Sequence, residues 1–226
     1  MVSMVKECFH SVSTKEDMPY SSFFLEAGPE GVRVTAFDTK RISIRGQINF
    51  SPQKEIIING QALKTVCQLV DRPVVTFTEK ALFINDRHFI ARINSSGNVY
   101  PRMHTLFPDC ALRFVVNRKE FLQGCNVLRQ LGQEMLIQRK ENELVLAVDS
   151  AAGIGRSIIS IVRLLSDNLK ASLKYRVNLA RLAEALDSIY ENEVELIFGG
   201  NYQPICIRGR SYIEVILCYI NGKSYR

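Results

Sequence analysis

An internal repeat constrains the fold of this chain more than any other feature of its sequence. Residues 56–93 and residues 175–217 each begin with a short apolar strand that ends in asparagine, Asn59 or Asn178. Asparagine favours a helix start because its side-chain oxygen accepts a hydrogen bond from an unpaired backbone N–H of the first turn. An amphipathic helix and alternating apolar strands follow. Each segment is therefore predicted to fold as a strand, a capped helix and three strands.

The predicted helices of the two copies carry apolar residues at three-to-four spacing, and the strands after them alternate. The helix positions are Leu63, Val66 and Val70 in one copy and Leu182, Leu186 and Ile189 in the other. The expected strands cover Val75, Phe77 and 83–93 in the first copy, and 194–198 and 205–217 in the second. Both periodicities predict elements with one buried face.

The remaining parts of the chain repeat a second time. Residues 112–128 read as a strand and then a helix capped by Asn117, with Glu120 three residues on, close to a capping box. Residues 4–44 give a matching helix (Val5, Cys8, Phe9, Val12) and three strands, but no strand before the helix. We therefore expect an α+β chain of two tandem domains, 1–110 and 111–226. We expect the first strand of the first domain to be missing, either because the chain is cut from a longer protein or because the start codon is placed late.

Composition narrows the class of protein. The chain of 226 residues has a net charge of +6 and 46% hydrophobic residues, and no apolar run approaches the roughly 20 residues of a membrane helix. The start of the sequence carries charge too early for a secretory signal, so we expect a cytoplasmic protein. Six scattered cysteines without a CxxC pair indicate reduced thiols packed as small hydrophobes.

Basic residues on the predicted helices are candidates for contact with phosphate groups. The mild positive charge is compatible with a polyanionic partner. A solvated helix face is the alternative interpretation, and glutamates on the same helices dilute the positive field. The predicted DNA-facing residues are Lys6, Lys64, Arg118, Lys119, Arg129 and Arg181.

Three segments of the chain carry a resemblance to a known family. They are VTAFDTKRIS (residues 34–43), YPRMHTLFP (residues 100–108) and MPYSSFFLE. Together they resemble segments of the bacterial DNA polymerase sliding clamp, the DNA polymerase III beta subunit. Residues 34–43 match a middle-domain segment of that family at Asp38, Arg41 and Ile42, and residues 100–108 match the end of that domain at Pro101 and Pro108. The order of these segments is that of the family's middle and C-terminal domains.

The resemblance implies two clamp domains, each with two helices packed on antiparallel sheets with a pseudo-twofold repeat. It implies a processivity factor that encircles duplex DNA without reading its sequence. The replicative polymerase, the clamp loader and repair proteins would dock short peptides in a cleft between the two domains. The cleft residues implied are Tyr20, Phe37, Thr39, Lys40, Arg41, Ile42, Pro101, Thr105, Leu106, Leu217, Cys218, Tyr219 and Ile220.

Two of these implications have alternatives in the sequence itself. Arg41 is as well explained by a structural ion pair with Asp38. The C-terminal residues Leu217–Ile220 stand where the family has an ending with proline and methionine, so the floor of the cleft differs.

Other function classes remain as alternatives. Histidines at positions 10, 88 and 104 and the cysteines supply no ordered nucleophile and base, and no glycine-rich phosphate loop is present. We expect no catalysis, no cofactor and no metal. A two-domain clamp that closes as a trimeric ring, or a module that binds peptides without forming a ring, would fit the same pattern.

Overall fold

The structure is a computed structural model that divides into two compact units. It describes residues 1–13, 21–49, 51–97, 100, 106–168, 173–200, 203–220 and 223–224. Unit 1 comprises Met1–Arg102 with Arg210–Ile213, and unit 2 comprises Met103–Gly209 with Glu214–Arg226. The domain boundary at residues 110 and 111 stays a prediction. Each unit is described by itself.

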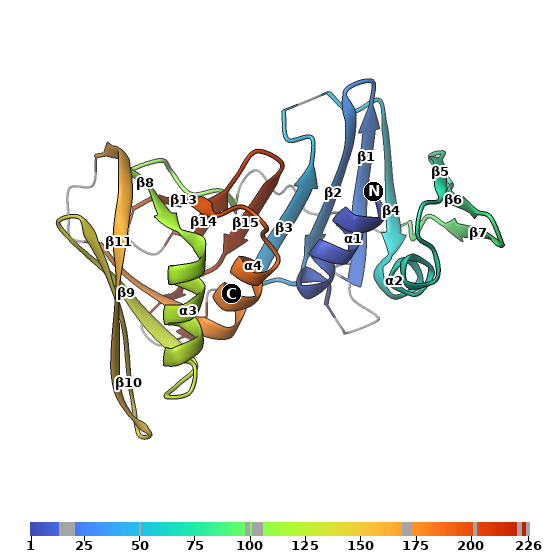
Figure 1. The fold of residues 1–226 in the computed structure, drawn as a ribbon. Helices are drawn as coiled ribbons and strands as arrows, with labels where there is room; N and C mark the ends of the chain where they lie inside the picture. Colours follow the sequence, from blue (N-terminus) through green and yellow to red (C-terminus); the bar gives the residue numbers. More distant parts are fainter. Residues whose placement is uncertain are drawn as a thin grey trace. The chain divides into compact units, whose positions relative to one another are not determined.

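Unit 1 is an α+β assembly in which helices cover an antiparallel sheet. Its sheet has the order β3-β2-β1-β4, and a separate three-stranded sheet has the order β5-β6-β7 (Figure 1). A single core of residues such as Val5, Phe23, Leu63 and Leu82 joins helices and both sheets. The elements are α1 (Val2–Cys8), a 3-10 turn η1 (Phe9–Ser11), β1 (Ser22–Gly28), β2 (Gly31–Phe37), β3 (Arg41–Gly46), β4 (Lys54–Asn59), α2 (Gly60–Leu69), β5 (Val74–Phe77), β6 (Ala81–Asp86) and β7 (Phe89–Asn94).

Unit 2 repeats this plan with one more strand at its start. Its strands follow the order β12-β9-β10-β11-β8-β13-β14. The elements are β8 (Leu112–Asn117), α3 (Arg118–Leu128), β9 (Glu134–Lys140), β10 (Glu143–Ser150), β11 (Gly153–Asp167), β12 (Lys174–Asn178), α4 (Leu179–Asp187), β13 (Glu193–Phe198), β14 (Ile205–Arg208), β15 (Tyr212–Ile216), β16 (Tyr219–Ile220) and β17 (Lys223–Ser224).

The long strand β11 joins two parts of the unit 2 sheet. Residues 153–160 pair with β10, whereas Ile161–Asp167 pair with β8 on the other edge, with register shifts on the way. β8 in turn pairs with β13 along its whole length, from Leu112↔Phe198 to Asn117↔Glu193. β8 is therefore the strand that connects the two halves of the repeat.

The predicted repeat of capped helices is confirmed. The side chain of Asn59 accepts a hydrogen bond from the N–H of Ala62, and that of Asn178 accepts one from the N–H of Arg181. Asn117 caps α3 in the same way, accepting from two N–H groups. Each cap satisfies donors that the first turn of a helix leaves unpaired.

The buried faces of the repeated helices also agree with the predicted spacing, with one difference. Leu63 and Val70 are buried, as are Leu182, Leu186 and Ile189. Val66 is only half-buried, and its neighbour Cys67 is fully buried in its place. The buried stripe of α2 and its C-cap is therefore Leu63, Cys67 and Val70, and Val66 lies at its margin.

Unit 1 has no described strand in the place that β8 takes in unit 2. In unit 2, β13 pairs with β8 on one edge and β14 on the other. β5 follows α2 as β13 follows α4, yet among the described residues it pairs only with β6. Among the described residues, β5, β6 and β7 form a separate sheet, and no strand there pairs with the outer edge of β5. The missing first strand of the first domain stays a prediction.

Two predicted elements are shorter than expected. The first helix ends at Cys8 and continues only as a 3-10 turn to Ser11, so Val12 lies beyond it. The predicted strand 205–217 is two strands, β14 and β15, separated by a turn. Within the described part of the chain, no helix is long and apolar enough to cross a membrane.

Five of the six cysteines pack inside the units, as predicted. They are free thiols, and only Cys110 is exposed. Burial raises the pKa of the Cys67 thiol to about 11 and that of Cys125 to about 12. The buried thiols are therefore protonated at neutral pH and behave as small apolar side chains. The buried residues are Cys8, Cys67, Cys125, Cys206 and Cys218.

Candidate functional site

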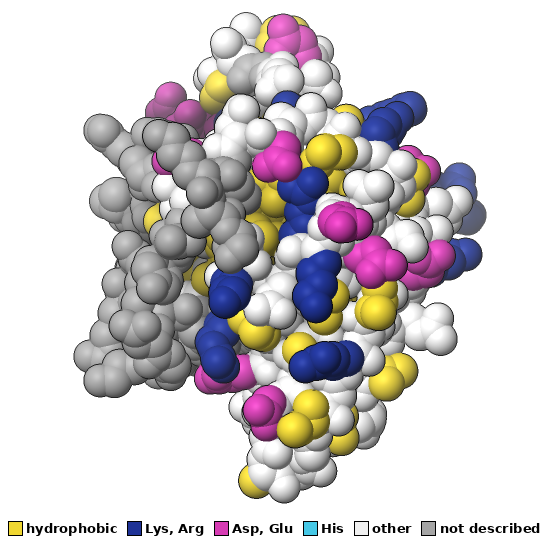
Figure 2. Space-filling model, turned by 90° about the vertical axis from the view of Figure 1, so that its left-hand side faces the viewer, with side chains coloured by type: hydrophobic (Ala, Val, Ile, Leu, Met, Phe, Trp, Pro, Cys, Tyr) yellow, Lys and Arg dark blue, Asp and Glu magenta, His cyan; other side chains and the backbone are white. Residues whose placement is uncertain are grey.

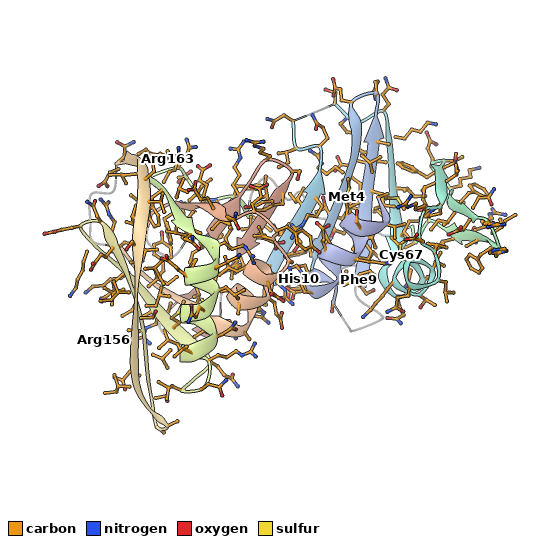
Figure 3. The ribbon with its side chains drawn as sticks, in the orientation of Figure 1. Met4, Phe9, His10, Cys67, Arg156 and Arg163 are labelled. Atoms are coloured by element: carbon orange, nitrogen blue, oxygen red, sulfur yellow. The ribbon has the colours of Figure 1, made fainter. Side chains whose placement is uncertain are left out.

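The two helices of unit 1 each present one predicted DNA-facing lysine. α1 and α2 contact each other, so the two side chains belong to one helix pair. Lys6 is exposed on α1. Lys64 is half-buried, and its Nζ lies 5.3 Å from the centroid of the Phe9 ring, a cation–π contact (Figure 3). The ring of Phe9 thus faces the ammonium group of Lys64.

The helix pair of unit 2 carries the other four predicted basic residues, in two different roles. Lys119 and Arg129 are exposed at the two ends of α3, and Arg181 is half-buried on α4. Arg118 is engaged inside the unit instead. It donates from Nη1 to the carbonyl of Leu186 and from Nε to the carbonyl of Glu191, at 3.0 and 2.9 Å.

These contacts give Arg118 a structural task that sequence reasoning did not anticipate. Leu186 lies in the last turn of α4, where carbonyl groups have no partner within the helix. A guanidinium at this position satisfies one of them and suits the negative end of the helix dipole. Of the four basic residues, Lys119 and Arg129 are therefore the ones best placed to meet an external phosphate.

Acidic residues accompany the basic ones on α3 and α4. Glu120, Glu184 and Asp187 are all exposed. The positive field of this helix pair is consequently local rather than continuous, as expected from the sequence. Such a surface favours loose contacts that weaken with salt.

The turn that connects β2 to β3 contains five of the predicted peptide-cleft residues. Asp38 Oδ1 accepts hydrogen bonds from the N–H groups of Lys40 and Arg41, both at 2.9 Å. Thr39, between Asp38 and Lys40, has a φ of 74°, in the left-handed region. Phe37 and Ile42 are buried in the core. Thr39 is exposed and Lys40 half-buried, so these two are the accessible members of the group.

Arg41 is committed to holding this turn. Its Nε lies 3.1 Å from Asp38 Oδ2, and its Nη2 donates to the carbonyl of His10. The side chain is 9% exposed and that of Asp38 14%. The ion pair with Asp38, named as the alternative from the sequence, is therefore present. The hydrogen bond to the carbonyl of His10 ties β3 to η1.

The remaining predicted cleft residues are described only in part. Leu106 and Leu217 are half-buried, and Cys218 is buried, with its pKa raised to about 12 by burial. Tyr219 and Ile220 form β16, which pairs with β17. Tyr20, Pro101 and Thr105 lie outside the described residues.

Ser43 and Cys67, two described residues with nucleophilic side chains, both lie inside unit 1. His10 Nε2 lies 3.0 Å from Ser43 Oγ, but Ser43 is completely buried and also bonds Ser11 Oγ. Cys67 is buried in α2 with a raised pKa, whereas His88 is exposed on the β6–β7 turn. Ser43 is therefore shielded from solvent, and Cys67 has little thiolate at neutral pH.

Sequence reasoning missed the basic residues on the face of the unit 2 sheet that points away from α3. Arg156 alternates with Ile154 and Ile158 along β11, and all three are exposed. The local signal was the isoleucine–arginine–isoleucine alternation at every second residue. Its partners on β12 are revealed only by strand register.

Comparison with known proteins shows which fold this arrangement of helices and sheets represents. The chain superposes on the DNA polymerase sliding clamp of Bacillus subtilis with a TM-score of 0.84 at 18% identity, over 97% of this chain and 63% of that one. This chain has the sliding-clamp fold. The DNA polymerase III beta subunit of Thermotoga maritima gives a TM-score of 0.84 at 16% identity, with the same coverage.

The similarity to known sliding clamps is low in sequence identity and covers only part of each of them. The beta clamp of Helicobacter pylori, described as bound to a DNA ligase peptide, gives a TM-score of 0.80 at 15% identity. The chain spans about 63% of the length of each of these three sliding clamps. No family model matches the sequence, and no curated protein matches it either. At this identity the likeness establishes the α+β clamp fold itself.

Proposed function

We propose that this chain acts in DNA replication as a sliding clamp, or as part of one, that tethers a polymerase to duplex DNA. The observation that carries the proposal is the clamp fold over nearly the whole chain, with the repeat of helix pairs backed by sheets. The proposed action is mechanical rather than catalytic and needs no cofactor. The proposed place of action is the cytoplasm.

In this proposal the exposed basic residues of the helix pairs face duplex DNA. Long lysine and arginine side chains reach phosphate oxygens and carry no sequence information, which suits a protein that must slide. Their dilution by acidic neighbours keeps each contact weak. Tethering then raises the effective concentration of a bound polymerase at the primer end.

The first test compares salt dependence of DNA binding between matched variants. Lys119→Gln with Arg129→Gln removes two exposed cations from α3, and Lys140→Gln with Lys174→Gln removes two exposed cations from the sheet. Each lost phosphate contact lowers the slope of log K against log salt by about 0.9. We expect the slope to fall by about 1 to 2 for the α3 variant and to stay unchanged for the sheet variant. Equal slopes in all three proteins would refute the DNA-facing assignment.

We further propose that the chain binds short apolar peptides of the polymerase, the clamp loader and repair proteins. The Helicobacter pylori clamp, described with a DNA ligase peptide, supports a peptide-binding role for this fold. Leu106 and Leu217 are the half-buried apolar members of the predicted set, and they suit an apolar groove that holds an extended peptide.

The peptide proposal is tested with the tail peptide of a bacterial replicative polymerase. Leu106→Ala with Leu217→Ala should weaken binding at least tenfold, because truncated anchors lose about 1–2 kcal/mol each. Leu69→Ala, at a leucine that is 65% exposed on α2, is the matched control and should bind as the unaltered chain does. Equal affinity of the double variant and the control would contradict the predicted site.

The mass in solution separates the ring alternatives. A trimeric ring gives three copies, and a module that binds peptides without a ring gives one. Sedimentation at several concentrations measures this directly.

A further inference from the structure

Strand register places two arginines on the same face of the unit 2 sheet, at the two ends of one row of residues that crosses four strands. Arg156 on β11 is the partner of Ala147 on β10, and Ala147 is the partner of Leu136 on β9. Leu136 is in turn the partner of Arg176 on β12. Partners in adjacent strands point to the same face, so the row reads arginine, alanine, leucine, arginine. With strands about 4.8 Å apart, the two arginine backbones are about 14 Å apart.

The neighbouring row has the same character. Ile158 pairs with Val145, Val145 with Gln138 and Gln138 with Lys174. Residues two apart on a strand share a face, so this row lies beside the first. Ile158 is 61% exposed and Lys174 is exposed, whereas Val145 is covered by its neighbours. We call the face formed by the two rows the outer face.

The outer face lies opposite helix α3. The intervening residues of β11 approach the helix side of the sheet: a Cβ on Gly155 would come within 2.4–2.8 Å of Leu131 and Leu128. The alternate residues Ile154, Arg156 and Ile158 therefore point away from α3. Ile154 is 72% exposed. No described helix covers this face, and isoleucines there stay in water.

The pictures place this pattern on one side of the molecule. Figure 2 shows basic, hydrophobic and some acidic side chains interleaved on the side where β9, β10 and β11 lie. In Figure 3, Arg156 is labelled on β11, with Arg163 farther along the same strand. Arg163 lies 3.8 Å from Glu193, so it belongs to an ion pair outside the two rows.

The side chains of the outer face indicate what kind of partner would bind there. Neither row contains an acidic residue, although the exposed Asp149 and Glu143 stand in the rows on either side, and three cations (Arg156, Arg176, Lys174) stand around an apolar centre. A solvated surface gains nothing from exposed isoleucines on either side of an arginine, whereas a contiguous apolar patch with a charged rim is typical of a docking surface. A nucleic acid backbone would pair with the cations but leave the apolar centre against phosphate.

We propose that the outer face binds an acidic polypeptide segment that carries apolar side chains between its carboxylates. Glutamate or aspartate side chains of the segment pair with Arg156 and Arg176, bidentately where the geometry allows. Its apolar side chains cover Leu136, Ala147 and Ile158. The partner is thus a protein with an acidic amphipathic segment, at a surface separate from the helices proposed to face DNA.

The test uses the full chain and a fluorescent peptide of alternating glutamate and leucine as the probe. Arg156→Glu with Arg176→Glu should weaken binding at least tenfold, because attraction becomes repulsion. A peptide of alternating lysine and leucine should show the reverse, binding the double variant more tightly than the unaltered chain. Arg87→Glu, at an exposed arginine on the β6–β7 turn of unit 1, is the matched control, and we expect it to change affinity less than twofold. All three sites are exposed, so circular dichroism should show unchanged folding.

Two further probes separate the proposal from its rivals. A peptide of alternating glutamate and serine should bind at least tenfold more weakly than the glutamate–leucine peptide. Oligo-dT of equal charge can also bind the helices, so its affinity for the Arg156→Glu, Arg176→Glu variant should stay within about threefold of that for the unaltered chain. If charge reversal weakens oligo-dT binding as much as peptide binding, the face is a general polyanion surface and the proposal is overturned. It is also overturned if charge reversal leaves peptide affinity unchanged, or if Ile158→Ser has no effect on it.

Discussion

Arg113 and Glu195 form an ion pair across the ladder between β8 and β13, with Arg113 Nε 2.6 Å from Glu195 Oε1. The hydrogen bond to Glu195 is the main cause that raises the pKa of Arg113. Thr76 stands on β5 at the position that Glu195 takes on β13, at the same distance after its cap asparagine. Arg113 therefore lies on β8, the strand of unit 2 that has no counterpart among the described residues of unit 1.

The ion pair should contribute modestly to stability. The Arg113 side chain is 36% exposed, so solvent screening limits the loss in Arg113→Gln to about 0.5–1 kcal/mol in the free energy of unfolding. Arg163→Gln is the control, because its 3.8 Å pair with Glu193 is exposed on both sides and should contribute nothing measurable. Urea denaturation of both variants checks this. Equal losses would show that the β8–β13 pair has no special role.

The open edge of β5 should be visible in hydrogen exchange. Thr78 donates to the carbonyl of Ala81 at the β5–β6 turn, so by ladder alternation the N–H groups of Val75 and Phe77 point away from β6. We expect these amides to exchange at least about tenfold faster than that of Thr76, which points to β6. The amides of Val194 and Leu196 should be protected, because β8 covers that edge of β13.

Slow exchange at Val75 and Phe77 would contradict an open edge and would mean that another strand covers β5. Repeating the measurement at several protein concentrations identifies coverage by a second copy, which would slow exchange only at high concentration.

Arg41→Ala should destabilise unit 1 whatever it does to peptide binding. Removing the guanidinium leaves the nearly buried Asp38 carboxylate without its ionic partner, and this typically costs about 3–5 kcal/mol. Lys54→Ala, at an exposed position of β4, is the control and should change stability by less than about 0.5 kcal/mol. Thermal unfolding of both measures the difference. A fully stable Arg41→Ala would show that the turn does not depend on this pair.

The cysteines should divide sharply by reactivity. Cys110 is exposed and should react with a thiol reagent at pH 8 in a single fast phase, which Cys110→Ser removes. The other five should react only after unfolding. A second fast thiol in the folded protein would contradict the packing of the core.

The same buried thiols predict how stability changes at alkaline pH. Burial raises the pKa of Cys125 to about 12 from an ordinary value of 9.0, so the unfolded chain loses this proton first. Its contribution is fully present below pH 9 and declines as the pH rises from 9 toward 12. Melting temperatures across this range should fall, and Cys125→Ala should fall less steeply.

Local signals in the sequence predicted much of this fold. Asn59, Asn117 and Asn178 act within one helical turn, so their caps are legible in a short window of sequence. A missing counterpart to β8 was predicted in the same way, because the repeat supplies its own reference, and among the described residues of unit 1 no strand takes that place. Apolar periodicity then gave the elements between these points, with errors of a few residues at the ends.

Features that depend on distant partners were not predictable. Arg118 looked like a solvent-facing cation, but its carbonyl partners lie about 70 residues away, at 68 and 73 positions along the chain. Arg156 and Arg176 belong to one surface only through the registers of three ladders. A one-residue slip in any of them would send a side chain to the other face.

Lysine footprinting on duplex DNA tests the central proposal most directly. The protein is acetylated with and without a duplex at low salt, and the modification of each lysine is read by mass spectrometry. The proposal predicts that DNA protects Lys6, Lys64 and Lys119 on the helices and leaves Lys140 and Lys174 on the strands unchanged. Protection of Lys140 and Lys174 with no change at the helix lysines would contradict it.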